Sequence, residues 1–365
     1  MTASRHDIIL EAVALEKRFA GRRRGLFAPP PTVRAVDGVS LRVRRGETLA
    51  LVGESGSGKS TLGRLMLDLM PPTAGDILYE GRNVGALSAA EKKTLRRDLG
   101  IVFQDPFASL NPRMSVADIV GEPIWLHQTL SRAGRRDKAA ELLRTVGLRP
   151  EHGDRYPHEF SGGQRQRIGI ARALASTPKL LLGDEPVSAL DVSVQAQIVN
   201  LLEDLKEAFG LTLLVVAHGL SVIRHMSDRV AVMYLGQIVE LAPVDALFDN
   251  PLHPYSQALL ASVPVPDPKA RKDRVLLDGD IPSATQPPPG CRFHTRCPHA
   301  RTLCRELRPE LEDVSDAGGR QVACHFWSEI AGAGAGALAA PPSAAFARRL
   351  ALFEARSKTA PAEAG

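Results

Sequence analysis

The sequence has no apolar run long enough to cross a membrane. Across 365 residues, no uninterrupted apolar stretch reaches about 18 residues, the length that marks a membrane-spanning helix. Residues 1–7 also contain no apolar core of the kind that a signal peptide carries. We therefore expect a cytosolic protein that does not itself span the membrane.

Cysteine is scarce, and charge of neither sign dominates. All four cysteines lie between Cys291 and Cys324. Disulfides are rare in the cytosol, so we do not expect a disulfide framework. The 46 basic and 41 acidic residues give a net charge of +5 and a pI near 9.1. This mild excess, with basic runs at 22–24 and 132–136, is typical of a solvated surface, and we expect no nucleic-acid partner.

The pattern of apolar residues indicates an α/β fold. Short apolar runs at 48–52, 100–103, 179–183 and 211–217 predict buried strands, and they alternate with segments of helical period. This alternation is typical of a mostly parallel sheet. Further strands are expected at 8–15, 36–43 and 76–79, an exposed loop at 20–34, helices at 88–99, 137–146 and 194–208, and a hairpin at 230–241 that turns at Leu235-Gly236.

The composition changes beyond residue 250. Residues 251–289 are rich in proline, the cysteines follow, and 331–340 consist mainly of alanine and glycine. We expect a first domain at 1–250 with a helical subdomain at about 105–165, a cysteine-containing extension at 251–330, and a disordered tail at 331–365.

Residues 53–60, Gly-Glu-Ser-Gly-Ser-Gly-Lys-Ser, form a phosphate-binding loop. The apolar run 48–52 leads into it, and a helical pattern follows, so the helix N-terminus faces the phosphates. Lys59 is expected to reach the β- and γ-phosphates, and Ser60 to bind Mg²⁺. The predicted nucleotide-binding residues of this segment are Gly53, Glu54, Ser55, Gly56, Ser57, Gly58, Lys59, Ser60 and Thr61.

Two adjacent carboxylates follow a second apolar run. Asp184 and Glu185 come directly after Leu180–Gly183. Successive strand residues point to opposite faces, so the chain must turn here if both side chains are to serve one site. Asp184 suits Mg²⁺ through its water shell, and Glu185 suits the activation of an attacking water.

Six motifs in order give the sequence its resemblance to a family. The phosphate-binding loop, Gln104, Ser161-Gly162-Gly163-Gln164, Asp184-Glu185, Ser188-Ala189-Leu190-Asp191 and His218 together resemble the ATP-binding cassette of ABC proteins. The resemblance covers residues from about 8 to 330. It implies a RecA-like parallel sheet with an antiparallel β subdomain and a helical subdomain, followed by the cysteine-containing extension.

The resemblance also implies a role for each motif. Two cassettes pair head to tail, so that Ser161, Gly162, Gly163 and Gln164 act in trans on the partner's ATP. Gln104 contacts Mg²⁺ and the attacking water and connects the site to the membrane partner. Asp191 communicates across the dimer, His218 contacts the γ-phosphate, and Phe19 stacks on adenine. The family usually has Ser-His-Asp where this chain has Ala217-His218-Gly219, and we expect the glycine to loosen that loop.

Other segments are similar to the oligopeptide/dipeptide/nickel branch of ABC importers. They include 104–112, 156–160, 185–193 and His253-Pro254-Tyr255, and the pattern at 164–173 resembles the F-type ATPase subunit. The branch implies a D-type ATPase subunit as a second cassette, two membrane permease subunits and an extracytoplasmic substrate-binding protein. The chain would then lie at the cytoplasmic face of the membrane.

The four cysteines leave three interpretations open. Their spacing is Cys291-x5-Cys297-x6-Cys304-x19-Cys324, which lacks the close pairs of zinc ribbons. Members of this branch carry a similar motif that is associated with a [4Fe–4S] cluster. Zinc and unliganded thiols are the alternatives, and His294, His299 and His325 are near enough in sequence to replace a thiolate. Any bound group would be structural.

The sequence therefore predicts an ATPase that drives peptide import. ATP binding closes the cassette dimer, and hydrolysis at Glu185 reopens it. Import of nickel or another small solute is the alternative within the branch. A soluble ABC protein and a binding module with an inactive site are the alternatives from other classes. A soluble ABC protein usually has two cassettes in one chain or a long coiled-coil insertion, and this sequence has neither. A binding module with an inactive site conflicts with the intact Lys59, Asp184, Glu185 and His218.

Overall fold

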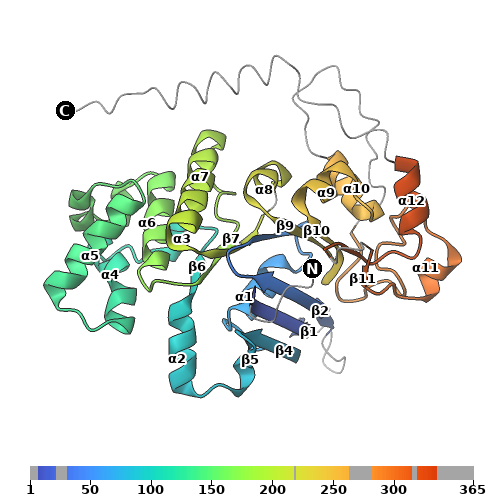
Figure 1. The fold of residues 1–365 in the computed structure, drawn as a ribbon, viewed down its shortest axis with the longest axis horizontal. Helices are drawn as coiled ribbons and strands as arrows, with labels where there is room; N and C mark the ends of the chain where they lie inside the picture. Colours follow the sequence, from blue (N-terminus) through green and yellow to red (C-terminus); the bar gives the residue numbers. More distant parts are fainter. Residues whose placement is uncertain (1–6, 22–30, 218, 263–280, 315–318, 335–365) are drawn as a thin grey trace, which may run out of the picture.

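The computed structural model describes residues 7–21, 31–217, 219–262, 281–314 and 319–334. In this part of the chain an antiparallel sheet lies beside a larger, mostly parallel sheet (Figure 1). The antiparallel sheet has the order β2 (Thr32–Arg44), β1 (Ile8–Ala20), β4 (Ala74–Tyr79), β5 (Arg82–Asn83). The larger sheet has the order β11 (Glu312–Asp313), β12 (Gln321–Val322), β10 (Gln237–Pro243), β9 (Arg229–Tyr234), β3 (Thr48–Val52), β8 (Thr212–Val216), β7 (Leu180–Asp184), β6 (Leu99–Val102).

Helices connect the strands and lie along and beyond the two ends of the larger sheet (Figure 1). They are α1 (Lys59–Met66), α2 (Ala89–Asp98), α3 (Pro106–Ser109), α4 (Val116–His127), α5 (Arg132–Thr145), α6 (Gly162–Leu174), α7 (Val192–Phe209), α8 (Leu220–Met226), α9 (Val244–Asp249), α10 (Pro254–Ala261), α11 (Thr302–Glu306) and α12 (Trp327–Gly334). Short 3₁₀ turns occupy Val84–Ala86, Pro150–Asp154 and Pro157–Glu159. None of the described helices is long and apolar enough to cross a membrane.

Strand β3 shows why the central strands are apolar throughout. Leu49 and Leu51 pack into the core shared with β1 and β2, whereas Ala50 and Val52 pack into the core under the helices. Side chains alternate between the two faces of a strand, so a strand covered on both faces must be apolar at every position. This burial fixes the carboxyl end of β3, from which the phosphate-binding loop emerges.

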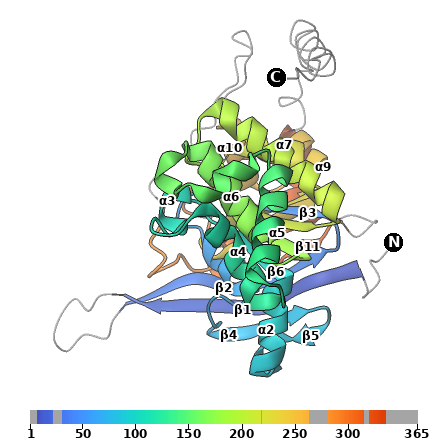
Figure 2. The ribbon, with the colours of Figure 1, turned by 90° about the vertical axis from the view of Figure 1, so that its left-hand side faces the viewer.

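The helices expected between about 105 and 165 are α3, α4 and α5, and they lie at one end of the sheet, facing the viewer in Figure 2. Helix α5 starts five residues before the predicted 137 because Ser131 caps it, accepting a hydrogen bond from the Gly134 N–H. The basic run 132–136 therefore lies on a helix.

Two sequence-based boundaries were wrong. Strands β1 and β2 pair as far as Ala20 and Thr32, well into the predicted loop 20–34. Antiparallel pairing satisfies the backbone there although the side chains are largely exposed, so apolar pattern could not reveal it. At the other end of the chain, α12 includes residues 331–334, which we assigned to the tail. The remainder of that tail, 335–365, and the basic run 22–24 lie outside the described residues.

The C-terminal extension packs against the end of the sheet opposite α4 and α5 (Figure 1). Strand β12 pairs with β10. Beneath it, the buried Glu240 carboxylate binds Arg320 at 3.0 Å and accepts hydrogen bonds from the backbone N–H groups of Leu252 and His253. A second ion pair joins Arg292 to Asp37 of β2. The extension is thus part of the same core and not an appended segment.

Candidate functional site

The phosphate-binding loop connects β3 to α1 in a conformation that requires glycine. Gly53 has φ 147° and Gly58 has φ 103°, and a Cβ on either would lie 2.2 Å or 2.1 Å from a backbone oxygen. Backbone packing therefore excludes any other residue at both positions. The expected fold of the loop, with a helix starting directly after it, is present.

Lys59 lies at the first position of α1 and is 4% exposed. Its ammonium donates hydrogen bonds to the carbonyl oxygens of Gly53 at 2.8 Å and Glu54 at 2.9 Å. Burial lowers the pKa of Lys59, and the nearby carboxylates of Glu185, Asp184 and Glu54 oppose that shift. The Lys59 ammonium thus lies close enough to these three carboxylates to interact with them electrostatically.

Asp184 and Glu185 lie where the sequence predicted a turn. Asp184 ends β7, and Glu185 has φ 53°, which turns the chain out of the strand. The Gln104 amide nitrogen, after β6, donates a hydrogen bond to the Glu185 carboxylate at 2.8 Å. Strands β6 and β7 are parallel neighbours, so residues that follow their carboxyl ends meet at one edge of the sheet.

The residues expected to hold Mg²⁺ fit a cation in one respect. The Oδ1 atom of Asp184 is buried and has no hydrogen-bond partner. Its Oδ2 atom accepts hydrogen bonds from the Arg64 guanidinium at 3.0 and 3.2 Å. A buried carboxylate oxygen without a partner is costly unless a ligand satisfies it, and Mg²⁺ with its water shell is such a ligand. Ser60 lies nearby in the first turn of α1.

Arg64 was not recognised from the sequence. It follows Lys59 by five positions on α1, where a basic residue is ordinary. Its contact with Asp184 joins residues 120 positions apart and depends on the packing of α1 against β7. No local pattern predicts such a contact.

The signature segment forms the exposed N-terminus of α6. The Ser161 hydroxyl accepts a hydrogen bond from the Gln164 N–H, and the Gln164 side-chain oxygen accepts one from the Ser161 N–H. A Cβ on Gly163 would lie 2.5 Å from Val194 of α7, whereas one on Gly162 would meet only ordinary contacts. A helix N-terminus of this kind, with a serine hydroxyl and glycine N–H groups, suits an anion.

The signature helix contacts the residues on either side of Gln104. The Arg165 guanidinium lies 3.7 Å from the centroid of the Phe107 ring, and the Gln166 amide donates to the Phe103 carbonyl at 3.4 Å. Side chains of α6 that follow the signature therefore contact the two phenylalanines that flank Gln104 in the sequence.

The other residues predicted to act on the nucleotide are not among the contacts described so far. Asp191 is exposed at the N-cap of α7. Phe19, near the end of β1, is 39% exposed and lies under the Lys17 ammonium, with 5.3 Å between the nitrogen and the ring centroid. Gly219 is the N-cap of α8 in extended backbone (φ −84°), while His218 lies outside the described residues.

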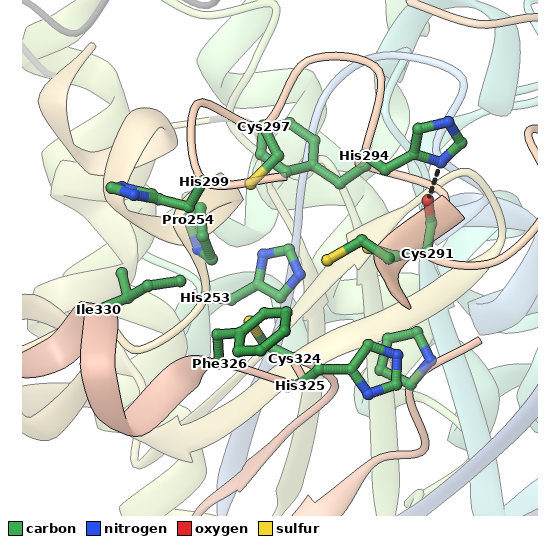
Figure 3. Close-up of a pocket in the computed structure, with 13 residues that line it drawn as sticks. His253, Pro254, Cys291, His294, Cys297, His299, Cys324, His325, Phe326 and Ile330 are labelled. Carbon is green, nitrogen blue, oxygen red and sulfur yellow. Dashed lines mark hydrogen bonds between the residues drawn. The ribbon is translucent and has the colours of Figure 1, made fainter. Parts of the chain in front are cut away.

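The four cysteines line one pocket of the extension (Figure 3). His253, His294, His299 and His325 also line it. Burial raises the pKa of Cys291, Cys297 and Cys324 to about 11 each. The donors expected from the sequence thus converge. Within the described ranges, however, no group of three or more His, Cys, Asp or Glu side chains is arranged to hold a metal ion.

The extension also reaches the phosphate-binding loop itself. The Tyr255 hydroxyl of α10 accepts a hydrogen bond from the Glu54 N–H at 2.8 Å. The Arg296 guanidinium, which lies between Cys291 and Cys297, forms two hydrogen bonds with the Glu54 carboxylate at 2.8 and 3.1 Å. Neither contact was predicted, since each joins residues more than 200 positions apart.

This fold, with its phosphate-binding loop, carboxylate pair and exposed signature helix, defines an ATPase of the cassette type. Residues 36–188 match the ABC transporter family, and residues 239–304 match the C-terminal region of oligopeptide/dipeptide transporters. The chain is 30% identical to the dimeric ATP-binding cassette MJ0796 in a post-hydrolysis state bound to ADP and Pi, with a TM-score of 0.57 over 65% of this chain and 99% of that one.

Similar sequences extend the match through both parts of the chain. The oligopeptide transport ATP-binding protein AppF of Bacillus subtilis is 52% identical over 332 residues, 90% of this chain and all of that protein. The dipeptide transport ATP-binding protein DppF of Escherichia coli is 48% identical over 316 residues, 87% of this chain and 93% of the other. The oligopeptide transport ATP-binding protein OppF of Salmonella typhimurium is 50% identical over 310 residues, 84% and 93% of the two chains.

The chain therefore belongs to the ABC transporter family, among the F-type ATP-binding subunits that carry the oligopeptide/dipeptide C-terminal region. The family and the fold class predicted from the sequence are confirmed, and the chain is an ATPase of this family.

Proposed function

We propose that this chain is the ATP-hydrolysing subunit of a membrane importer for oligopeptides or dipeptides. The observation that carries the proposal is the match of cassette and extension together to peptide-transport ATP-binding proteins at about half identity over most of both chains. The extension supports it further, because its match is to a peptide-transporter region and not to cassettes in general.

The proposed mechanism assigns each residue one task. The loop N–H groups and Lys59 bind the phosphates, where their positive charge opposes the polyphosphate charge. Glu185 orients and deprotonates the attacking water, and Gln104, hydrogen bonded to it, holds its orientation. Ser60, Gln104 and Asp184 would hold Mg²⁺, which would supply positive charge against the phosphates of ATP. His218 contacts the γ-phosphate, and Phe19 stacks on adenine.

The second half of each nucleotide site comes from a partner cassette. Ser161 is exposed, Gly162, Gly163 and Gln164 are partly exposed, and this helix N-terminus suits an anion, which supports a role on the partner's nucleotide; Asp191 is exposed for contact across the dimer. Because ATP binds the closed pair better, it shifts the pair toward closure, and release after hydrolysis reopens it. The partner cassette is proposed to be a D-type subunit.

Two membrane permease subunits and an extracytoplasmic binding protein complete the proposed assembly. This chain would lie at the cytoplasmic face of the membrane. Large apolar side chains are exposed after Gln104: Phe107 of α3 is 64% exposed and Trp125 of α4 is 63% exposed. Exposed apolar groups near a functional segment mark interaction sites, and these two suit contact with a permease.

ATP-dependent uptake into vesicles that contain the assembled complex tests the proposed function. We expect a labelled di- or oligopeptide to accumulate when ATP is supplied on the side of this chain. Accumulation of Ni²⁺ without any peptide would instead assign the chain to nickel import.

We further propose that Cys291, Cys297, Cys304 and Cys324 hold a [4Fe–4S] cluster that pins the extension to the cassette. The support is the convergence of four thiols on one pocket. Zinc is the alternative, because it also accepts four thiolates. Either group needs deprotonated ligands, so at neutral pH its binding must release the protons that burial, by raising the pKa, keeps on Cys291, Cys297 and Cys324.

Metal content measured after anaerobic purification distinguishes these states. We expect about four iron atoms per chain and visible absorption from thiolate-to-iron charge transfer, both lost in a Cys291→Ser, Cys304→Ser double variant. A colourless protein with one zinc per chain would replace the cluster by zinc. A metal-free protein would show that the thiols are unliganded.

A further inference from the structure

Glu54 places a negative charge inside a loop that is built to bind anions. It is the second residue of the phosphate-binding loop, and its carbonyl oxygen accepts a hydrogen bond from the Lys59 ammonium at 2.9 Å. Its carbonyl also accepts from the Ser57 N–H at 3.2 Å. The position of Glu54 therefore affects the lysine directly, and an uncompensated carboxylate here would repel the polyphosphate of ATP.

Arg296 compensates this charge. Its two guanidinium nitrogens bind the two carboxylate oxygens of Glu54 at 2.8 and 3.1 Å. The Arg296 side chain is 6% exposed and that of Glu54 is 25% exposed, so solvent screens the pair weakly. A bidentate contact of this kind fixes the orientation of the Glu54 carboxylate as well as compensating its charge.

Rigid elements of the extension hold Arg296 in place. Its backbone N–H donates to the Phe293 carbonyl at 3.0 Å in a turn between Cys291 and Cys297. The Phe293 ring is buried and packs edge-on against Tyr234, at 5.3 Å between centroids, and against Tyr255, at 5.4 Å. Tyr255 in turn accepts the hydrogen bond from the Glu54 N–H. Side chain and backbone of Glu54 are thus both held by the extension.

We propose that Arg296 is a positioning residue for ATP binding, which neutralises and fixes Glu54 so that the C-terminal extension sets the affinity of the phosphate-binding loop. The inference rests on the proposed use of residues 53–60 as the nucleotide site. It differs from a purely structural role in one respect: Arg296 matters for ATP only while Glu54 carries its charge.

A double-mutant cycle tests this distinction. Arg296→Gln leaves the Glu54 charge unpaired beside the phosphates, and we expect it to raise KM for ATP by about tenfold, within the range typical of coupling between two sites, with kcat within about twofold of wild type. Glu54→Gln combined with Arg296→Gln removes both charges, and we expect its KM to be about threefold or more below that of Arg296→Gln alone.

The matched control is Arg301→Gln. Arg301 belongs to the same extension and forms an exposed ion pair with Glu329, which does not involve the loop. We expect it to leave both KM and kcat unchanged. Thermal unfolding of each variant shows whether the extension remains folded. If Arg296→Gln does not fold, Arg296→Lys replaces it, since lysine keeps the charge but loses the bidentate contact. For Arg296→Lys we expect about a threefold rise in KM for ATP.

Two results would overturn the proposal: an unchanged KM in a folded Arg296 variant, or a double variant no better than Arg296→Gln alone. Failure of the proposed nucleotide site has a different signature, because wild type itself would then neither bind nor hydrolyse ATP, whereas a failure of peptide import alone would leave ATP binding in place. Equilibrium binding of a fluorescent ATP analogue to the full chain, measured beside the kinetics, separates the two.

Discussion

Replacing Glu185 by glutamine is expected to reduce ATP turnover by a factor of about 10² to 10⁴, the range that a positioned general base contributes. Glutamine has nearly the same shape, and its side-chain oxygen can still accept the hydrogen bond from Gln104, so the fold of the site is expected to persist. What is lost is the ability to take a proton from water. Binding of ATP should remain, because Lys59 and the loop are unchanged.

The measurement is phosphate release by the purified chain, alone and in its assembled complex, together with ATP binding. Glu207→Gln is the matched control, since it makes the same chemical change on the exposed surface of α7. Turnover of the Glu185 variant at the wild-type rate would exclude this carboxylate as the catalytic base.

Replacing Ser161 by arginine is expected to reduce turnover of the assembled complex by about 100-fold, a loss comparable to that from removing one preorganised donor at a reacting anion. The arginine removes the hydroxyl from the N-terminus of α6 and fills the surface on which the partner's nucleotide would dock. The effect should fall on the partner's site: ATP binding to the isolated variant is expected to match wild type, because its own loop is intact.

Ser88→Arg is the matched control for that variant. Ser88 caps α2 with the same reciprocal arrangement that Ser161 uses, its partner being Glu91. Both substitutions therefore remove a similar helix cap, and each is expected to lower the free energy of unfolding by about 1 kcal/mol. Equal turnover in the Ser88 and Ser161 variants would mean that the signature acts only as a helix cap and has no role in trans.

Much of the site could be predicted because its parts are local. The phosphate-binding loop and the signature are contiguous segments whose backbone geometry follows from their own glycines and caps. The turn at Glu185 was also predictable, since two neighbouring carboxylates at a strand end cannot otherwise face one site. The resemblance to a family assigned Gln104 and Glu185 to the same attacking water, but the hydrogen bond between them, 81 positions apart, was not predicted; the parallel pairing of β6 and β7 explains it.

Contacts that depend on tertiary packing could not be predicted. Arg64 looks like any surface arginine of a helix until α1 is packed beside β7. Arg296 lies 242 positions from Glu54, so no local pattern relates the two residues. A shared site for the cysteines was predicted from their number in one short segment and from the resemblance to a family, but the identity of any bound group was not, because thiols serve several metals.

Peptide uptake driven by ATP tests the central claim most directly, which is that ATP hydrolysis by this chain powers peptide import. Vesicles containing the complete complex, loaded with binding protein and a labelled peptide, are compared with vesicles that carry Glu185→Gln in this chain. We predict ATP-dependent accumulation of peptide with the wild-type chain, and a loss of accumulation in the variant that parallels its loss of phosphate release. Accumulation at the wild-type rate in the variant, or no ATP-dependent peptide uptake by the wild-type complex, would contradict the account.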